Sequence, residues 1–160
     1  MGKYLELLEN ILREEDFEQT FWGTIGTGIL PICTKTKRIL MAYRSKMVNE
    51  PNSWGTIGGR IDNPENLNIE EEAKREFLEE TGYNKNLKLI PAYIFSNPNF
   101  KYYNFIGLLD EEFEPKTDWE TEFFQWMSFD EMIAKKNDFH FGLEKLLNDP
   151  KSLKIIRTYS

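Results

Sequence analysis

Three glutamates, Glu76, Glu79 and Glu80, have the spacing in this sequence that best supports a chemical role. In a helix, residues three and four positions apart lie on one face, so these carboxylates would gather in one place. Like charges at this spacing destabilise a helix by about 0.2–0.5 kcal/mol per pair, and Arg75 offers only one positive charge against several. Mg²⁺ would balance them better, because it prefers carboxylate oxygens and substrate phosphates. The alternative is a solvated acidic helix face without chemistry.

The helix that would carry these glutamates has start and stop signals in the sequence. Asn68 is a suitable N-cap, and Glu71 follows three residues later, as in a capping box. Gly82 is placed to end the helix in a left-handed conformation that other residues resist. Apolar residues recur every four positions between these ends and are expected to face the core: Ile69, Ala73 and Phe77.

The segment 54–84, which contains this helix, resembles the signature box of the Nudix hydrolases. The order Arg-Glu-apolar-any-Glu-Glu-any-Gly-apolar is complete over residues 75–83. Gly59, five further residues and Glu65 match the first half of the box. The box covers about a fifth of the chain, and its second half is specific.

Two positions depart from the family pattern. Nine residues separate Glu65 from Arg75, where the family has seven. The extra two are expected to lengthen the loop 62–68 and to displace Glu65, because the helix itself has clear ends. Ile57 stands where many members have proline before the two glycines.

The resemblance implies a Mg²⁺-dependent enzyme that hydrolyses a diphosphate linkage, with Mn²⁺ as an alternative ion. It implies that Glu76, Glu79, Glu80 and the carbonyl of Gly59 hold the metal. Glu79 or another carboxylate would assist the attacking water, and Arg75 would orient the glutamates through an ion pair. The catalytic residues implied in this way are Glu79, Arg75 and Glu76.

Further candidate residues are less specific. A later acidic residue often contributes in this family, and Asp118, Glu120 or Glu122 could serve, although all three also suit a solvated acidic loop. The only histidine, His140, lies between two phenylalanines near an expected helix start, which favours a structural role. A zinc site is not expected, because one histidine lacks partner ligands.

The substrate is indicated only weakly. A proline about fifteen or sixteen residues past the box marks ADP-ribose hydrolases in this family, and Pro98 lies sixteen residues after Gly82. The nearby aromatic residues Phe100, Tyr102 and Tyr103 could stack on a base or simply pack in a strand. ADP-ribose or a nucleotide sugar is therefore favoured. The alternatives are a triphosphate pyrophosphohydrolase that cleans the nucleotide pool, a hydrolase of dinucleoside polyphosphates, and a non-catalytic nucleotide sensor on the same fold.

Composition limits the class of protein. The 160 residues suit a single domain over 1–160, with 40% hydrophobic residues for a core and a formal net charge of −7. This charge argues against general binding of nucleic acid or anionic membranes. Cys33 is the only cysteine, so a reducing, cytoplasmic setting is expected. An isoprenyl diphosphate isomerase shares the Nudix fold and uses a catalytic cysteine, but Cys33 lies in an apolar run without a supporting motif.

The remaining elements suggest a mixed sheet between helices, an α/β class that agrees with the α/β/α sandwich implied by the resemblance. An amphipathic helix is expected at about residues 3–14, either packed on the domain or forming a homodimer contact. Asp138 is expected to cap a last helix, which Asn148-Asp149-Pro150 would stop. A capping box at Ser128 and Glu131 predicts a helix before it. The expected strands are 21–34, 38–44, 54–57, 87–96, 102–109 and 122–127.

Overall fold

The computed structural model describes residues 23–48, 50–61, 68–117 and 119–160. The expected N-terminal helix, Glu65 and Asp118 lie outside these residues. The elements follow in chain order: β1 Thr24–Cys33, β2 Ile39–Arg44, β3 Trp54–Gly55, β4 Ile57–Arg60, α2 Ile69–Thr81, β5 Lys88–Asn97, β6 Phe100–Leu109, β7 Thr121–Met127, α3 Phe129–Ile133, the 3₁₀ helix η2 Lys136–Asp138, α4 Phe141–Asn148 and α5 Pro150–Tyr159.

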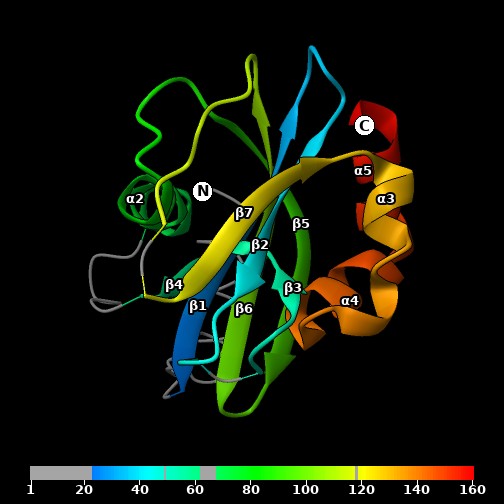
Figure 1. The fold of residues 1–160 in the computed structure, drawn as a ribbon. Helices are drawn as coiled ribbons and strands as arrows, with labels where there is room; N and C mark the ends of the chain where they lie inside the picture. Colours follow the sequence, from blue (N-terminus) through cyan, green and yellow to red (C-terminus); the bar gives the residue numbers. More distant parts are fainter. Residues whose placement is uncertain (1–22, 49, 62–67, 118) are drawn as a thin grey trace.

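Among the described residues, the strands form one seven-stranded mixed sheet. Its main order is β3-β2-β1-β6-β5, while β4 pairs with β1 and β7 pairs with β2. The pair β1·β6 is parallel along the full length of both strands, and the other named pairs are antiparallel. β1 therefore lies at the centre of the sheet, with β6 along one side. On its other side, β4 pairs with residues 26–29 and β2 pairs at Ile32 (Figure 1).

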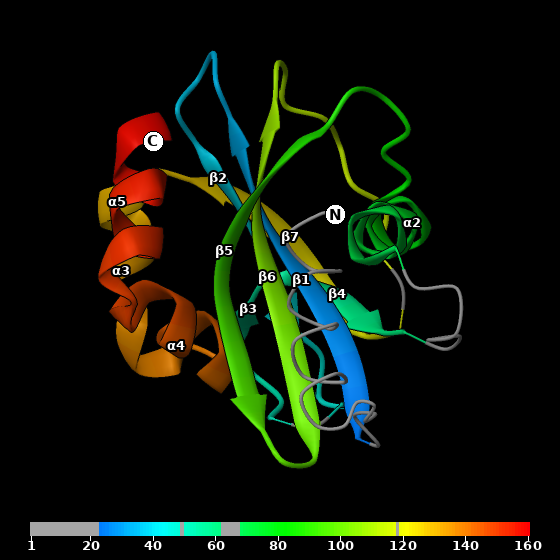
Figure 2. The same cartoon turned by 180° about the vertical axis from the view of Figure 1, so that it is seen from behind.

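Helices cover both faces of this sheet. Helix α2 lies on one side, and α3, α4 and α5 lie on the other, as the two opposite views show (Figures 1 and 2). This arrangement is the α/β/α sandwich with a mixed sheet that the sequence predicted. None of the described helices is long and apolar enough to cross a membrane.

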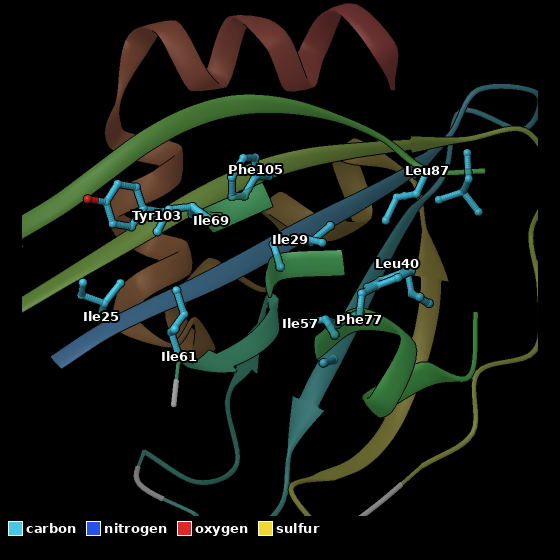
Figure 3. Packing of buried hydrophobic residues seen from close by; sticks show 13 residues of the cluster. Ile25, Ile29, Leu40, Ile57, Ile61, Ile69, Phe77, Leu87, Tyr103 and Phe105 are labelled. Atoms are coloured by element: carbon cyan, nitrogen blue, oxygen red, sulfur yellow. The ribbon is translucent and has the colours of Figure 1, made fainter. Parts of the chain in front are cut away.

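Alternating side chains of β1 fill two separate cores, because successive residues of a strand point to opposite faces. Ile25 and Ile29 contribute to the core beneath α2, and Leu30 and Ile32 contribute to the core beneath α3, α4 and α5. Figure 3 shows the first of these cores, in which Phe77 of α2 packs beside the strands. Phe77 is 1% exposed and anchors α2 to the sheet.

Several sequence-based boundaries agree closely with the structure. β5 pairs only with β6 among the described strands and is therefore an edge strand, with a register shift between Pro91 and Ile94, as Pro91 suggested. The capping box of α3 is present, with both the Ser128 and the Glu131 side chains bonded to backbone N–H groups.

The C-terminal helices correct two expectations. Asp138 does not cap a helix but belongs to η2, and the N-cap of α4 is His140. Asp149 and Pro150 follow the end of α4 and also begin a further helix, α5, since the Asp149 carboxylate accepts hydrogen bonds from the backbone N–H and the hydroxyl of Ser152. Aspartate at the N-cap and proline in the first turn are helix-starting signals, which a stop signal does not exclude.

Candidate active site

Helix α2 is held by the two caps that the sequence predicted. The Asn68 side chain accepts a hydrogen bond of 3.1 Å from the backbone N–H of Glu71. Gly82 has φ 82° and donates its backbone N–H to the carbonyl of Leu78. Because Ile69 and Phe77 are buried against the sheet, the rotation of the helix is fixed, and the face that carries the box arginine and glutamates has a defined direction.

Arg75 organises three glutamates on this helix. Its Nε and Nη2 donate to Oε1 of Glu72 at 3.0 and 2.8 Å, and its Nη1 donates to Oε2 of Glu79 at 2.7 Å. A weaker bond of 3.2 Å joins Nη2 to Oε2 of Glu76. The hydrogen bonds with Glu72 and then Glu79 raise the pKa of the Arg75 guanidinium, so it stays charged. Arg75 thus has the contacts expected of a residue that orients the glutamates.

Glu76 joins the helix to the Gly58-Gly59 strand. A methyl group added at Gly59 would lie 2.7 Å from Oε1 and 3.1 Å from Cδ of Glu76. The absence of a side chain at Gly59 therefore lets the carboxylate lie directly against the backbone of β4. The Glu76 side chain is only 14% exposed. Gly59 and Glu76 both belong to the predicted metal ligands and are 17 residues apart in the sequence. The fold brings them into contact.

Replacing Gly59 by alanine is expected to lower kcat/KM by up to about 100-fold with little loss of stability, because the added methyl displaces a flexible carboxylate and not the backbone. Gly55→Ala is the matched control, since a methyl there meets its nearest atom at an ordinary 3.5 Å. Both variants would be compared with wild type for hydrolysis and thermal unfolding. Unchanged hydrolysis by Gly59→Ala would mean that the position of Glu76 does not matter.

The predicted metal ligands differ in exposure. Glu80 is 8% exposed, whereas the side chain of Glu79 is 57% exposed. Carboxylate oxygens and a backbone carbonyl are a donor set that fits Mg²⁺ in chemistry. Within the described part of the chain, however, no three acidic, histidine or cysteine side chains are gathered closely enough to hold a metal ion. The Arg75 guanidinium, bonded to Glu76 and Glu79, supplies positive charge among them instead.

The structure places the other acidic candidates on and before β7. The carbonyl of Glu120 accepts a hydrogen bond from the backbone N–H of Ser45 at 3.0 Å, and Glu122 is exposed. Their part in the reaction, like that of Asp118 and Glu65, stays a prediction.

A polar group around Tyr102 was not predicted from the sequence. Tyr102 forms a hydrogen bond with Thr56, and burial raises its pKa to about 12. The charges of Glu80 and Glu76 add to this increase, and that of Arg44 opposes it, so all three act on the Tyr102 hydroxyl. From the sequence, only base stacking or packing in a strand is expected of Tyr102. The signal that could have found the group is the pair of glycines in β1, Gly26 and Gly28, beside which the Tyr102 ring lies.

His140 has the structural role that the sequence favoured. Its Nδ1 accepts a hydrogen bond of 3.1 Å from the backbone N–H of Gly142 and thereby caps α4. The neutral tautomer therefore carries its proton on Nε2, which faces Oε2 of Glu50 at 3.7 Å. Burial lowers the pKa of His140, with Arg44 adding to this decrease and Glu50 opposing it.

Replacing His140 by asparagine, which also caps helices well, is expected to remove a pH dependence of stability. Because the folded pKa of His140 is lowered, the unfolded chain binds more protons as the pH falls below about 6.5, and wild-type stability decreases there until the folded pKa is passed. Urea unfolding of both proteins at several pH values between about 5 and 7.5 measures the difference. An equal decrease in the two proteins would show that His140 is not its cause.

Comparison with known proteins shows the family of this chain. A family model described as NUDIX domain matches residues 23–149. The chain therefore belongs to the NUDIX family, and the family and the enzyme class predicted from the box, a Nudix-type pyrophosphohydrolase, are confirmed.

Solved structures show the same fold at low sequence identity. The MutT protein from Methanosarcina mazei Go1 is 18% identical with TM-score 0.58, and the match covers 78% of this chain and 90% of that one. A Nudix hydrolase from M. smegmatis, RenU, is 14% identical with TM-score 0.63 and 85% coverage of both chains. A bifunctional NMN adenylyltransferase/ADP ribose pyrophosphatase from Francisella tularensis is 15% identical with TM-score 0.57, covering 92% of this chain and 46% of that one.

Proposed function

We propose that the protein is a Mg²⁺-dependent hydrolase that cleaves the diphosphate linkage of a nucleoside diphosphate joined to another moiety, with ADP-ribose or a nucleotide sugar as the favoured substrate. The observation that carries this proposal is the placement of Glu76 against Gly59, beside Glu79 and Arg75 on the same helix. These elements lie apart in the sequence, and the fold unites them.

The roles follow from the positions of the side chains. Glu76, Glu79, Glu80 and the Gly59 carbonyl would hold Mg²⁺, which supplies an activated water and neutralises phosphate charge when bound. To hold the ion, Glu79 would release its hydrogen bond with Arg75. Arg75 would keep its place on the helix, because it also bonds Glu72. The exposed Glu79 is the carboxylate best placed to accept a proton from the attacking water.

The favoured substrate is supported by aromatic residues near Pro98, which lies in the turn between β5 and β6. Phe100 is partly exposed, and its ring stacks on that of Tyr102 with centroids 5.8 Å apart, so Phe100 offers a surface for a base. Tyr103 does not, because it is fully buried in the core beneath α2. The description of the Francisella protein as an ADP ribose pyrophosphatase points to the same substrate.

Two alternatives remain distinct from this proposal: a triphosphate pyrophosphohydrolase, and a nucleotide sensor without catalysis. The isomerase is disfavoured, because Cys33 is 0% exposed and lies at the end of β1 inside the fold. The free thiol of this buried cysteine fits a cytoplasmic protein. A homodimer contact through the helix expected at about residues 3–14 of the single domain also stays part of the proposal.

A substrate panel with Mg²⁺ separates these functions. ADP-ribose, an ADP-sugar, a dinucleoside polyphosphate and a nucleoside triphosphate would be incubated with the enzyme, and the products resolved by chromatography. Release of AMP from ADP-ribose or the ADP-sugar is expected. Release of pyrophosphate from the triphosphate alone would favour the first alternative, and binding without turnover of any compound would favour the second.

A further inference from the structure

The side chain of Tyr102 lies over two glycines of the central strand. In the parallel register of β1 and β6, Gly26 is opposite Tyr102. A methyl group added at Gly26 would lie 3.0 Å from Cδ1 of Tyr102, and one added at Gly28 would lie 2.5 Å from its hydroxyl oxygen. The two glycines thus leave space on the sheet that the Tyr102 ring occupies. The same methyl at Gly28 would lie 2.7 Å from Oγ1 of Thr56, so both hydroxyl groups meet above Gly28.

This hydroxyl pair has one proton more than its shared hydrogen bond uses. Tyr102 and Thr56 share one hydrogen bond, which uses one of their two hydroxyl protons. Burial keeps the pKa of Tyr102 at about 12, so the phenol stays protonated at any pH suitable for the enzyme. A protonated hydroxyl next to a charged substrate atom forms a stronger hydrogen bond than a neutral pair does.

Opposite charges flank the pair. At one end of the segment 55–59, the Cδ atom of Arg44 lies 3.7 Å from the position of a methyl on Gly55, and at the other end Glu76 lies against Gly59. Four residue steps of extended chain span about 14 Å at most. Thr56 lies within this span, so the Tyr102–Thr56 pair is located between the acidic cluster and Arg44. Arg44 is fixed in direction, because its Nε donates to the carbonyl of Glu50 at 3.2 Å.

We propose that Tyr102, supported by Thr56 and Arg44, binds the phosphoryl group that leaves with the nucleoside, while the glutamates act on the other phosphoryl group. This subsite rests on the proposed diphosphate hydrolase function. It assigns Tyr102 as a substrate-binding residue whose hydroxyl donates a hydrogen bond to a non-bridging phosphate oxygen. The group that this subsite would bind is a phosphate monoester of a ribose.

The test is equilibrium binding of AMP, which contains this phosphate and no linkage to cleave. Tyr102→Phe removes only the hydroxyl, and Tyr103→Phe is the matched control, because Tyr103 is the next residue of β6 and points into the opposite core. Calorimetric titrations with Mg²⁺ present would give Kd for wild type and both variants. We expect Kd to rise about 10-fold in Tyr102→Phe and less than about 2-fold in Tyr103→Phe.

Adenosine, which lacks the phosphate, distinguishes a contact with phosphate from a contact with the base. Its Kd is expected to be the same in wild type and Tyr102→Phe. An equal rise of Kd for AMP and adenosine, or equal affinities of wild type and Tyr102→Phe for AMP, would overturn the assignment, as would a loss of thermal stability that accounts for the weaker binding. AMP binding requires no turnover. Absence of hydrolysis in the substrate panel would therefore refute the proposed function, whereas the AMP titrations test the Tyr102 subsite separately.

Discussion

Replacing Glu79 by glutamine is expected to lower kcat by about 100-fold or more and to leave the fold intact. The amide cannot supply the negative charge that a metal ligand or a general base needs. Stability should change little, because the Arg75–Glu79 ion pair is largely exposed and its amide replacement can still accept a hydrogen bond from Arg75. The measurements are kcat and KM on one substrate at saturating Mg²⁺, together with thermal unfolding.

Two further variants give this result its meaning. Glu70→Gln removes the same charge from an exposed position in the first turn of α2 and should retain nearly full activity. Glu65→Gln is expected to lose less activity than Glu79→Gln, because the two extra residues of the box loop are expected to displace Glu65. Wild-type turnover by Glu79→Gln would move the chemistry to another residue, and a collapse of its melting temperature would make Glu79 structural.

Removal of divalent cations is expected to abolish hydrolysis, and added Mg²⁺ should restore it. The protein has a formal net charge of −7, and the proposed site contains Glu76, Glu79 and Glu80, so an anionic diphosphate is repelled unless a cation reverses the local sign. Initial rates would be followed while Mg²⁺ is titrated into enzyme treated with excess chelator. A chelator saturated with Mg²⁺ beforehand is the control for direct effects of the chelator on the enzyme. An undiminished rate of hydrolysis in excess chelator would refute the metal requirement.

Local signals explain why the catalytic helix could be predicted from the sequence. The N-cap Asn68, the glycine Gly82 with positive φ and the apolar face with Phe77 each act within a few residues, so the boundaries of α2 depend little on the rest of the fold. The family box then predicts that Glu76 and Gly59 meet, and the structure shows that contact.

Tertiary contacts explain what the sequence did not show. His140 caps α4 through its ring nitrogen, a role that asparagine, aspartate, serine and threonine usually take, and this made Asp138 the more obvious candidate. The Tyr102–Thr56 hydrogen bond joins β6 to the connection between β3 and β4. It depends on the register of β6 against the glycines of β1, and no pattern in a single sequence specifies that register.

Binding of Mn²⁺ to the metal-depleted protein, followed by the electron paramagnetic resonance signal of the free ion, tests most directly whether the α2 carboxylates hold a divalent cation. Wild type and Glu70→Gln are expected to bind Mn²⁺ saturably with similar Kd. The combined variant Glu76→Gln, Glu79→Gln and Glu80→Gln is expected to bind at least about 10-fold more weakly, because it has lost the oxygen charges that a hard cation needs. Equal Mn²⁺ affinity of wild type and the folded combined variant would contradict a metal site on this helix.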